Sequence, residues 1–286
     1  MEPKDVRHAG VVGCGLMGSG IVEVLARAGL RVTFVEGSEE LVQRGRAAVE
    51  RSVHKAVDRG KLDPAAARDL LTQISGATEL QALEDVDLVI EAATEQLDAK
   101  LEIFRTLGRL TRPGVVLASN TSSIPIAQLA LASGRPADII GMHFFNPPPV
   151  MKLLELTPAD TTSPETFAFV RAFGTEVLGK ICVRSADQAG FIVNRLLIPY
   201  LFDAIRLLEQ EFTSAEDIDT AIELGLAHPM GPLALADLIG LDTVLSIGEV
   251  LHRAFPQEKY EAPALLRRMV EDGKLGRKSG EGFYPY

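Results

Sequence analysis

The first two-thirds of the chain alternate short apolar runs with stretches in which apolar residues recur at helical spacing. The apolar runs predict strands at 6–12, 31–35, 88–91, 115–119, 139–142, 151–157 and 180–184. Helical spacing predicts helices at 17–28, 39–59, 64–73, 98–110 and 126–132, and one more that starts at Ser163 and Pro164 and stops at Gly179. This alternation is typical of an α/β fold with a mostly parallel, Rossmann-like sheet, here with a helical hairpin inserted at 39–73.

The pattern changes after Arg184. Strand-like runs disappear, and helical spacing predicts helices at 190–210, 215–223, 232–239, 241–254 and 264–271. We therefore expect two domains, with the sheet in residues 1–184 and an all-α domain in residues 185–286. No internal repeat of 20 to 50 residues is present, which argues against a solenoid or propeller.

The charge balance restricts the ligands that the chain can attract. Its 286 residues carry a formal net charge of −10, and 47% of them are hydrophobic. An acidic protein has no general electrostatic attraction for nucleic acid or for an anionic membrane surface. We therefore expect neither as a partner, and an anionic small molecule would need local basic residues.

Cysteine usage and the most apolar stretch bear on the cellular compartment. Cys14 and Cys182 have no metal-ligand spacing and make a poor disulfide framework, which favours a reducing cytoplasm. Residues 191–208 are strongly apolar, but polar and charged side chains interrupt them. A buried amphipathic helix tolerates this pattern, whereas a membrane-spanning helix does not. We see no targeting segment at the start of the sequence.

A glycine-rich turn lies between the first predicted strand and the first predicted helix. Gly13, Gly15 and Gly18 form a GxGxxG pattern, and Glu36 ends the following strand. In this pattern the glycines permit a tight turn, close approach of a pyrophosphate and close strand–helix packing. An acidic side chain at the end of the next strand can bind a ribose 2′-hydroxyl and repels a 2′-phosphate. The pattern therefore predicts an NAD site, the alternative being a strand turn that binds no nucleotide.

Among the five histidines, His143 is the candidate for chemistry. It follows the predicted strand 139–142, and the carboxyl ends of parallel strands line the ligand crevice of such sheets. The stiff segment 144–149 comes next. A neutral imidazole can take the proton of an alcohol during hydride transfer. His8 and His54 lie in polar surroundings and are expected at the surface, and His228 lies in a rigid, proline-bounded connector.

Glu155 lies in an apolar run on the next predicted strand. A carboxylate among leucines needs a partner, because otherwise it loses its hydration without compensation. The residues alone do not pair Glu155 with His143, and a histidine in a loop can equally be structural.

Taken together, these motifs resemble those of the L-3-hydroxyacyl-CoA dehydrogenases, particularly the short bacterial 3-hydroxybutyryl-CoA type. The resemblance covers essentially the whole chain. It rests on Gly13 to Gly18, Ser119-Asn120-Thr121-Ser122-Ser123, His143-Phe144-Phe145-Asn146-Pro147 with Glu155 downstream, Asp187 to Arg195, His228-Pro229-Met230-Gly231-Pro232, and the closing Gly276 to Tyr284. An ordered set of this kind is more specific than any single motif.

The resemblance implies roles for four catalytic residues. His143 would be the general base, and Glu155 would hold its tautomer and stabilise the imidazolium that forms. Ser122 and Asn194 would hydrogen-bond the substrate 3-oxygen, where charge develops. Because Asn194 belongs to the second domain, this assignment places the site in an interdomain cleft. Ser122 could instead cap the following helix, and Asn194 could be an ordinary polar group at a helix start.

The resemblance also implies ligand contacts. The expected NAD contacts are Gly13, Gly15, Leu16, Met17, Gly18, Glu36, Ala93, Glu95, Lys100, Asn120, Ser122, His143, Asn146 and Lys278. The expected substrate contacts are Ser52 and Arg59 for coenzyme A, together with Ser122 and Asn194. The alternative for Glu95 and Lys100 is a solvated ion pair near a helix start, and the alternative for Ser52 and Arg59 is a solvated helix face. The chain departs from the family where Glu36 and Arg59 replace a frequent Asp and a frequent Lys.

The function implied is reversible NAD-dependent oxidation of a 3-hydroxyacyl-CoA, with 185–286 as a substrate and homodimerisation domain. Ile198, Leu201, Ile205 and Leu208 could serve a dimer interface or the domain's own core. A 3-hydroxyadipyl-CoA dehydrogenase of aromatic degradation is an alternative. Two others are a β-hydroxyacid dehydrogenase with a lysine base and a non-enzymatic, crystallin-like NAD-binding protein.

Overall fold

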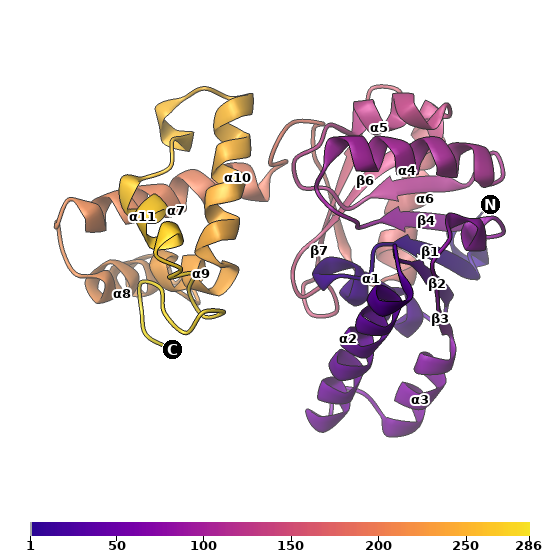
Figure 1. Ribbon diagram of the computed structural model, residues 1–286, viewed down its shortest axis with the longest axis horizontal. Helices are drawn as coiled ribbons and strands as arrows, with labels where there is room; N and C mark the ends of the chain where they lie inside the picture. The colour runs from indigo at the N-terminus through magenta and orange to yellow at the C-terminus, as the bar shows by residue number, and fades with distance from the viewer. Residues whose placement is uncertain (1) are drawn as a thin grey trace. The chain divides into compact units, whose positions relative to one another are not determined.

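The computed structural model describes residues 2–286 of the chain. Its internal contacts divide the chain into two compact units, Met1–Asp187 and Gln188–Tyr286. The division lies three residues beyond the boundary expected at 184. The first unit contains the whole β-sheet, and the second is built from helices (Figure 1).

The first unit is organised around an eight-stranded sheet with the order β3-β2-β1-β4-β5-β6-β7-β8. The strands are β1 (His8–Val12), β2 (Arg31–Val35), β3 (Ile74–Ala77), β4 (Leu88–Glu91), β5 (Val116–Ser119), β6 (Ile139–Phe144), β7 (Leu153–Pro158) and β8 (Ile181–Arg184). Strands β1 to β6 are parallel, and β7 runs antiparallel to β6 and parallel to β8. This arrangement confirms the predicted mostly parallel, Rossmann-like fold.

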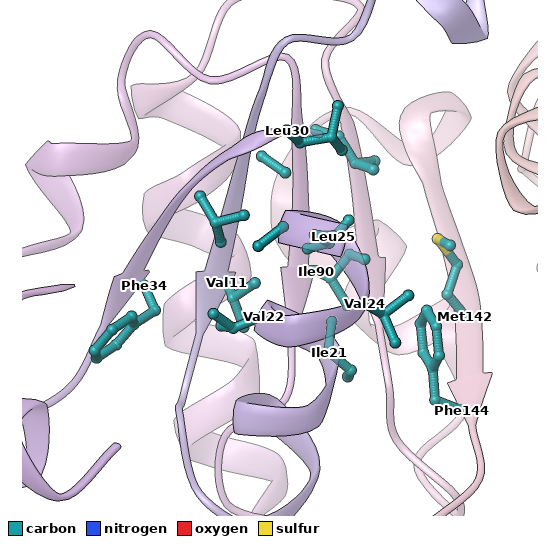
Figure 2. Packing of buried hydrophobic residues seen from close by; sticks show 14 of the residues in the cluster. Val11, Ile21, Val22, Val24, Leu25, Leu30, Phe34, Ile90, Met142 and Phe144 are labelled. Atoms are coloured by element: carbon teal, nitrogen blue, oxygen red, sulfur yellow. The ribbon is translucent and has the colours of Figure 1, made fainter. Parts of the chain in front are cut away.

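Helices cover both faces of the sheet, and the alternation of apolar residues along each strand explains why. Val11 belongs to a core shared with α1, α2, α3 and α6, whereas its neighbour Val12 belongs to a core shared with α4 and α5. The helices are α1 (Leu16–Arg27), α2 (Glu39–Asp58), α3 (Pro64–Thr72), α4 (Leu97–Leu110), α5 (Ile126–Ser133) and α6 (Pro164–Ala172). Figure 2 shows the first of these cores, where Ile21 and Leu25 of α1 pack near Val11 and Ile90 of the sheet.

Local sequence signals set several helix ends. The Asp63 carboxylate accepts hydrogen bonds from the backbone N–H groups of Ala65 and Ala66, and Pro64 occupies the first turn of α3. Ser163 caps α6 in the same way by accepting from the N–H of Thr166. Both starts lie where the sequence predicted them.

Three details of the first unit differ from the sequence prediction. Strand β3 was not predicted, because its Ser75 and Gly76 are exposed and polar and give no apolar run. Strand β6 extends to Phe144, so His143 lies within the strand and not after it. His8 was expected at the surface but is buried, with its Nε2 2.8 Å from the Thr33 hydroxyl.

The second unit consists of five α-helices packed around one core. They are α7 (Val193–Glu209), α8 (Ala215–Leu226), α9 (Pro232–Ile239), α10 (Leu241–Ala254) and α11 (Ala264–Glu271). Ile198, Leu201 and Ile205 are fully buried in this core, with exposed fractions of 1%, 0% and 0%. They are therefore core residues of the unit and not an exposed interface.

Two buried carboxylates fasten the end of the chain to this bundle. Asp219 accepts hydrogen bonds from the N–H of Leu233 and from the Tyr284 hydroxyl. Asp237 accepts from the backbone N–H groups of Phe283 and Tyr284, each at 3.0 Å. The closing segment recognised in the sequence is thus held by specific acceptors.

Short helical turns complete the structure. The 3₁₀ turns are η1 (Pro3–Asp5), η2 (Leu80–Leu83), η3 (Pro136–Asp138) and η5 (Glu258–Tyr260), and η4 (Phe173–Val177) is a π-helical turn.

Within residues 2–286, none of the helices combines the length and the apolar character needed to cross a lipid bilayer.

Candidate active site

The turn between β1 and α1 has the backbone geometry that its glycines predict. Gly13 adopts a φ of +88°, a left-handed conformation that L side chains rarely adopt. A Cβ at Gly18 would lie 1.9 Å from the Gly13 carbonyl oxygen, so α1 can approach the turn only with glycine there. At Gly15, by contrast, a Cβ would meet nothing within 4 Å. The open space at Gly15 lies beside the N-terminus of α1, where a pyrophosphate is stabilised by backbone N–H groups.

A cavity of about 700 Å³ opens beside this turn, between the start of α1 and the helix α2. Glu36 lines it, and the Oε1 of Glu36 accepts a hydrogen bond from the N–H of Cys14 at 2.5 Å. This bond fixes the carboxylate next to the glycine turn, as a ribose-binding acid requires. The turn, the acid and the cavity therefore fit a dinucleotide.

The same cavity contains two arginines that the sequence analysis did not single out. Arg44 and Arg51 of α2 line it, 8 and 15 residues after Glu36 in the sequence. No basic residue follows Glu36 directly, so the sequence contains no local sign of them. Helical spacing, which places residues 44 and 51 on one face of α2, is the signal that could have identified them.

His143 and Glu155 form a hydrogen-bonded pair. They lie directly opposite each other on β6 and β7, and the His143 Nδ1 is 2.8 Å from the Glu155 Oε2. Both are buried, with exposed fractions of 7% and 1%. Met142, Phe144 and the leucines beside Glu155 belong to the core under α1, so the pair projects from the opposite face of the sheet. The carboxylate thus has the partner that its apolar surroundings require.

Two side chains hold the backbone that carries His143. The Asn120 Oδ1, just after β5, accepts a hydrogen bond from the N–H of Phe144 at 2.8 Å. The buried Lys180 donates to the carbonyl oxygens of Pro148 at 2.6 Å and Met151 at 2.7 Å. Lys180 had not been predicted as a site residue, and burial lowers the pKa of its ammonium group. Asn146 begins the turn that Lys180 holds, and a cis peptide bond joins it to Pro147.

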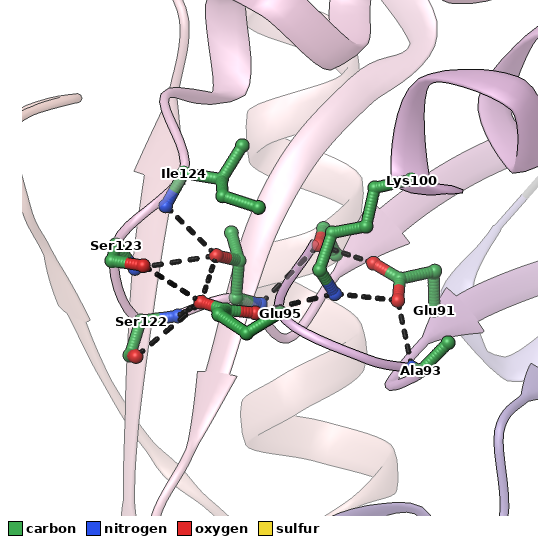
Figure 3. A network of polar contacts seen from close by, with 9 residues as sticks. Glu91, Ala93, Glu95, Lys100, Ser122, Ser123 and Ile124 are labelled. Carbon is green, nitrogen blue, oxygen red and sulfur yellow. Dashed lines mark hydrogen bonds and ion pairs between the residues drawn. The ribbon is translucent and has the colours of Figure 1, made fainter. Parts of the chain in front are cut away.

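Glu95 organises the loop after β5. Its Oε1 accepts hydrogen bonds from the Thr121 hydroxyl at 2.5 Å, from the Ser122 N–H at 2.9 Å and from the Ser123 hydroxyl at 3.0 Å (Figure 3). Burial acts to raise the pKa of the Glu95 carboxyl, but the nearby Lys100 ammonium and these hydrogen bonds outweigh it and hold that pKa below its usual value. Glu95 is therefore an anion that keeps the Ser122 segment in one conformation.

Lys100 is a buried residue and not one of a solvated pair. Only 1% of its side chain is exposed, and its Nζ lies 2.6 Å from the Oε1 of Glu91, which is itself fully buried. The Ala93 N–H also donates to this oxygen, and the Ser119 hydroxyl donates to the other one. Glu91 was not predicted as a site residue, because a carboxylate at the end of an apolar strand carries no sign of its partners.

The remaining predicted residues lie elsewhere. Ser52 and Arg59 lie seven residues apart at the far end of α2, half-buried and exposed respectively. In the second unit, Asn194 is buried in the first turn of α7, and the Lys278 ammonium pairs with the Asp242 carboxylate.

The first unit brings together most of the predicted site residues at the carboxyl ends of its parallel strands. They are the residues of the glycine turn, Glu36, Glu95, Asn120, Ser122, His143 and Glu155.

A buried imidazole–carboxylate pair in a sheet that also carries a dinucleotide turn is suited to removing a proton while a hydride departs. These features define the chain as an NAD-dependent oxidoreductase. Comparison with known families makes the assignment specific. The model of the 3-hydroxyacyl-CoA dehydrogenase NAD-binding domain matches residues 8–188, and that of the C-terminal domain of the same enzymes matches residues 190–286. The chain belongs to the 3-hydroxyacyl-CoA dehydrogenase family.

Relatives support this over almost the full length. A 3-hydroxybutyryl-CoA dehydrogenase of Mycobacterium tuberculosis is 48% identical over 282 residues, covering 98% of this chain and 99% of the relative. A probable 3-hydroxybutyryl-CoA dehydrogenase of Bacillus subtilis is 43% identical, with 99% and 98% covered.

Solved structures agree. The crystal structure of FadB2 from M. tuberculosis matches with a TM-score of 0.96 and 47% identity, covering 98% of this chain and 99% of the other. That of (S)-3-hydroxybutyryl-CoA dehydrogenase from Ralstonia eutropha matches with a TM-score of 0.92 and 44% identity, covering 99% of both. The resemblance stated from the sequence is confirmed, as are the enzyme class and NAD as its cofactor. The alternatives are not favoured.

Proposed function

We propose that this enzyme acts on short-chain substrates and interconverts L-3-hydroxybutyryl-CoA and acetoacetyl-CoA. The names of the full-length relatives support the short acyl chain. The buried His143–Glu155 pair is the observation that supports the chemistry. A dicarboxylic acyl-CoA is the competing substrate within the same family.

In the proposed mechanism His143 is the general base. Because its Nδ1 faces the Glu155 carboxylate, Nδ1 carries the ring proton in the neutral imidazole and Nε2 accepts the proton of the substrate hydroxyl. The Glu155 carboxylate then stabilises the imidazolium that forms. When bound, NAD⁺ supplies the acceptor for the hydride that leaves C3 of the substrate. In the reverse direction the imidazolium returns its proton to the 3-oxygen.

Ser122 and Asn194 are the proposed hydrogen-bond donors to the substrate 3-oxygen. The hydrogen bond from the Ser122 N–H to Glu95 supports this role, because it fixes the backbone that carries the hydroxyl, and a preorganised donor stabilises developing charge better than a mobile one. Asn194 is buried in the first turn of α7. Lys278, Asn146 and Ala93 remain proposed cofactor contacts.

The coenzyme A moiety is expected to need local positive charge. The chain as a whole is acidic, with a net charge of −10, and therefore repels a polyanion unless cations are gathered at the binding site. Ser52 lies in the last two turns of α2, and Arg59 is the residue that caps the C-terminus of this helix. We propose that these two residues contact the coenzyme A tail.

A screen of NADH consumption tests the proposed substrate. We expect the highest kcat/KM with acetoacetyl-CoA among 3-ketoacyl-CoAs of four to sixteen carbons, with 3-oxoadipyl-CoA included. Free acetoacetate should be a poor substrate, because binding energy from the coenzyme A part would be lost. A preference for 3-oxoadipyl-CoA would replace the proposed substrate, and NADH binding without turnover of any acyl-CoA would refute the enzymatic role.

We also propose a cytoplasmic homodimer. Several large apolar side chains of the helical unit are exposed, including Leu196 at 70%, Phe212 at 73% and Leu224 at 81%. We propose that these side chains form part of the interface, where they would be removed from water. The two free cysteines are compatible with the reducing cytoplasm.

A further inference from the structure

The buried Lys180, which directly precedes β8, is hydrogen-bonded to the segment between β6 and β7. We call this segment, residues 145–152, the β6–β7 turn. Lys180 is only 8% exposed, and its Nζ donates to the carbonyl oxygen of Pro148 at 2.6 Å and to that of Met151 at 2.7 Å. Burial of an ammonium group is costly unless hydrogen bonds replace its hydration. Both of the acceptors that replace it here belong to the β6–β7 turn.

The backbone of Lys180 is itself held in place. Its N–H donates to the carbonyl oxygen of Gly174 in η4 at 2.8 Å. The N–H of the next residue, Ile181, donates to the carbonyl oxygen of Lys152 at 2.8 Å. The ammonium group therefore extends from a base that is fixed on both sides.

The β6–β7 turn packs closely on α1, the helix that follows the glycine turn. Pro148 is buried, and a Cβ at Gly20 of α1 would lie 2.6 Å from the Cδ of Pro148. Within the turn, the N–H groups of Val150 and Met151 donate to the carbonyl oxygen of Pro147, at 2.9 and 3.0 Å. The turn is thus a compact unit, with α1 against Pro148 and the Lys180 ammonium on two of its carbonyl oxygens.

The start of the β6–β7 turn carries two residues of the site. The Phe145 ring lies against the His143 imidazole, with 4.6 Å between the ring centroids. Asn146 is exposed and is one of the proposed cofactor contacts. Both lie beyond the end of β6, so the strand pairing of the sheet does not fix them. Their positions depend on the contacts that hold the turn.

We propose that Lys180 is a positioning residue that holds the β6–β7 turn on α1 and thereby places Asn146 against the bound cofactor. Lys180 acts through the carbonyl groups of Pro148 and Met151 and touches neither the cofactor nor the substrate. Without the ammonium, these two carbonyl oxygens lose their donor, and the turn is held less firmly. The inference rests on the proposed role of Asn146 as a cofactor contact.

A double-mutant cycle between Lys180→Met and Asn146→Ala tests the proposal. Methionine keeps the length of the lysine stem and removes the donor. We expect Lys180→Met to raise the dissociation constant for NADH, measured by fluorescence, by roughly tenfold, because the cofactor contact is misplaced. In the Asn146→Ala background the same change should cost less than about threefold, because the contact that Lys180 positions is already absent.

Steady-state kinetics at saturating NADH distinguish positioning from a general loosening of the enzyme. We expect kcat of Lys180→Met with acetoacetyl-CoA to fall by roughly tenfold, because the nicotinamide is poorly aligned with the substrate. The KM for acetoacetyl-CoA should change less than about threefold, since the proposed coenzyme A contacts on α2 are unaltered. Lys152→Met is the matched control, because Lys152 ends the same turn with an exposed side chain. It should leave kcat and the dissociation constant for NADH unchanged.

Folding is examined separately. Loss of two buried hydrogen bonds should lower the Tm of Lys180→Met by roughly 5 to 15 °C. Amide hydrogen exchange measured by mass spectrometry should be faster in the peptide that spans the β6–β7 turn and unchanged in β1 and β2. Lys180→Gln is a second variant, since its amide is one bond shorter than the lysine stem and keeps a polar group beside the carbonyl oxygens. We expect a smaller loss of Tm with the same rise in the NADH dissociation constant.

Specific results would overturn the proposal. An unchanged NADH dissociation constant in Lys180→Met, or additive losses in the cycle with Asn146→Ala, would reduce Lys180 to a residue of the core. The same conclusion would follow if neither Lys180→Met nor Lys180→Gln folds, or if hydrogen exchange rises equally throughout the sheet. If Asn146→Ala itself binds NADH normally, the proposed role of Asn146 fails together with this inference. If Asn146→Ala is impaired and Lys180→Met is normal, the inference alone fails.

Discussion

His143 and Glu155 are joined by a 2.8 Å hydrogen bond because the antiparallel register of β6 and β7 places the two residues directly opposite each other. In an antiparallel pair, opposite residues project from the same face of the sheet, so the two side chains meet without any flexible segment between them. The geometry of the acid–base pair is therefore a property of the sheet. This is a rigid support of the kind that catalytic groups need.

Glu155→Gln is expected to impair catalysis without impairing cofactor binding. The amide keeps the shape of the carboxylate but cannot stabilise an imidazolium, and it can favour the wrong imidazole tautomer. We expect kcat to fall by roughly a hundredfold or more, and His143→Gln to lose at least as much. Stopped-flow kinetics with acetoacetyl-CoA, together with NADH titrations that should show nearly unchanged affinity, provide the measurement. Near-normal turnover in His143→Gln would refute the assignment of the base.

Of two alanine substitutions in the glycine turn, only one should lower the stability of the protein. Gly18→Ala places a Cβ 1.9 Å from the Gly13 carbonyl oxygen, so we expect a lower Tm together with lost NADH binding. Gly15→Ala places its Cβ where nothing lies within 4 Å, so the protein without cofactor should keep its Tm. The NADH dissociation constant should nevertheless rise by roughly tenfold or more, because the methyl group obstructs the pyrophosphate. An unchanged dissociation constant in Gly15→Ala would show that the phosphates bind elsewhere.

Glu36→Ala should relax the preference for NADH over NADPH. The carboxylate is fixed by the Cys14 N–H beside a cavity that also contains Arg44 and Arg51. Without this negative charge, the arginines that line the cavity are expected to attract a 2′-phosphate. We expect the ratio of kcat/KM for NADH to that for NADPH to fall by roughly tenfold or more. Restored discrimination in Glu36→Asp, which keeps the charge, is the control, and an unaltered ratio in Glu36→Ala would contradict the role of Glu36.

Much of the fold was predictable because buried parallel strands and their covering helices have distinct apolar patterns. The strands at 31–35 and 88–91 and the helices α9, α10 and α11 lie where the sequence placed them. Strand β3 was missed because Ser75 and Gly76 pair at the edge of the sheet with no apolar face to bury. An edge strand is held by backbone hydrogen bonds, which leave no trace in the side-chain pattern.

The site was predictable in its components but not in its pairings. The type and position of His143 suggested a base, yet its contact with Glu155 depends on the register between two strands, which the turn at 145–152 sets. Lys100 was predicted as a cofactor contact, with a solvated ion pair as the alternative, and its burial was not predicted because lysines are rarely buried. Its actual environment depends on Glu91, whose apolar neighbours in the sequence indicate only a strand. Contacts between distant segments were therefore what the sequence alone could not supply.

Asp87→Asn should reduce stability at neutral pH but not at acidic pH. Burial acts to raise the pKa of the Asp87 carboxyl, but hydrogen bonds from the Arg7 and His8 N–H groups and from Arg112 hold that pKa below its ordinary value of 3.8. A group whose pKa is lowered by folding stabilises the folded state above its unfolded pKa, and this stability is lost as the pH falls through the folded pKa. Thermal unfolding from pH 7 to pH 3 should therefore show a Tm difference from the unsubstituted protein that shrinks below about pH 4.

The control for this experiment is Asp69→Asn, because Asp69 is exposed on α3. Its Tm should follow that of the unsubstituted protein at every pH. A Tm difference for Asp87→Asn that stays constant from pH 7 to pH 3 would mean that the carboxylate charge contributes nothing at this position.

Substitution of exposed apolar residues in the helical unit should separate the proposed dimer. The Phe212 and Leu224 side chains are exposed by 73% and 81%. Ile198, Leu201 and Ile205, by contrast, are buried in the core of the helical unit. A charge placed in an apolar interface is not compensated when the interface forms, so Phe212→Asp/Leu224→Asp should yield monomers at micromolar concentration in sedimentation velocity. Leu131→Asp is the matched control, since Leu131 is equally exposed, at 72%, but lies on α5 of the first unit. A dimer that survives the double substitution would move the interface to another surface, and a monomeric unsubstituted protein would refute the dimer itself.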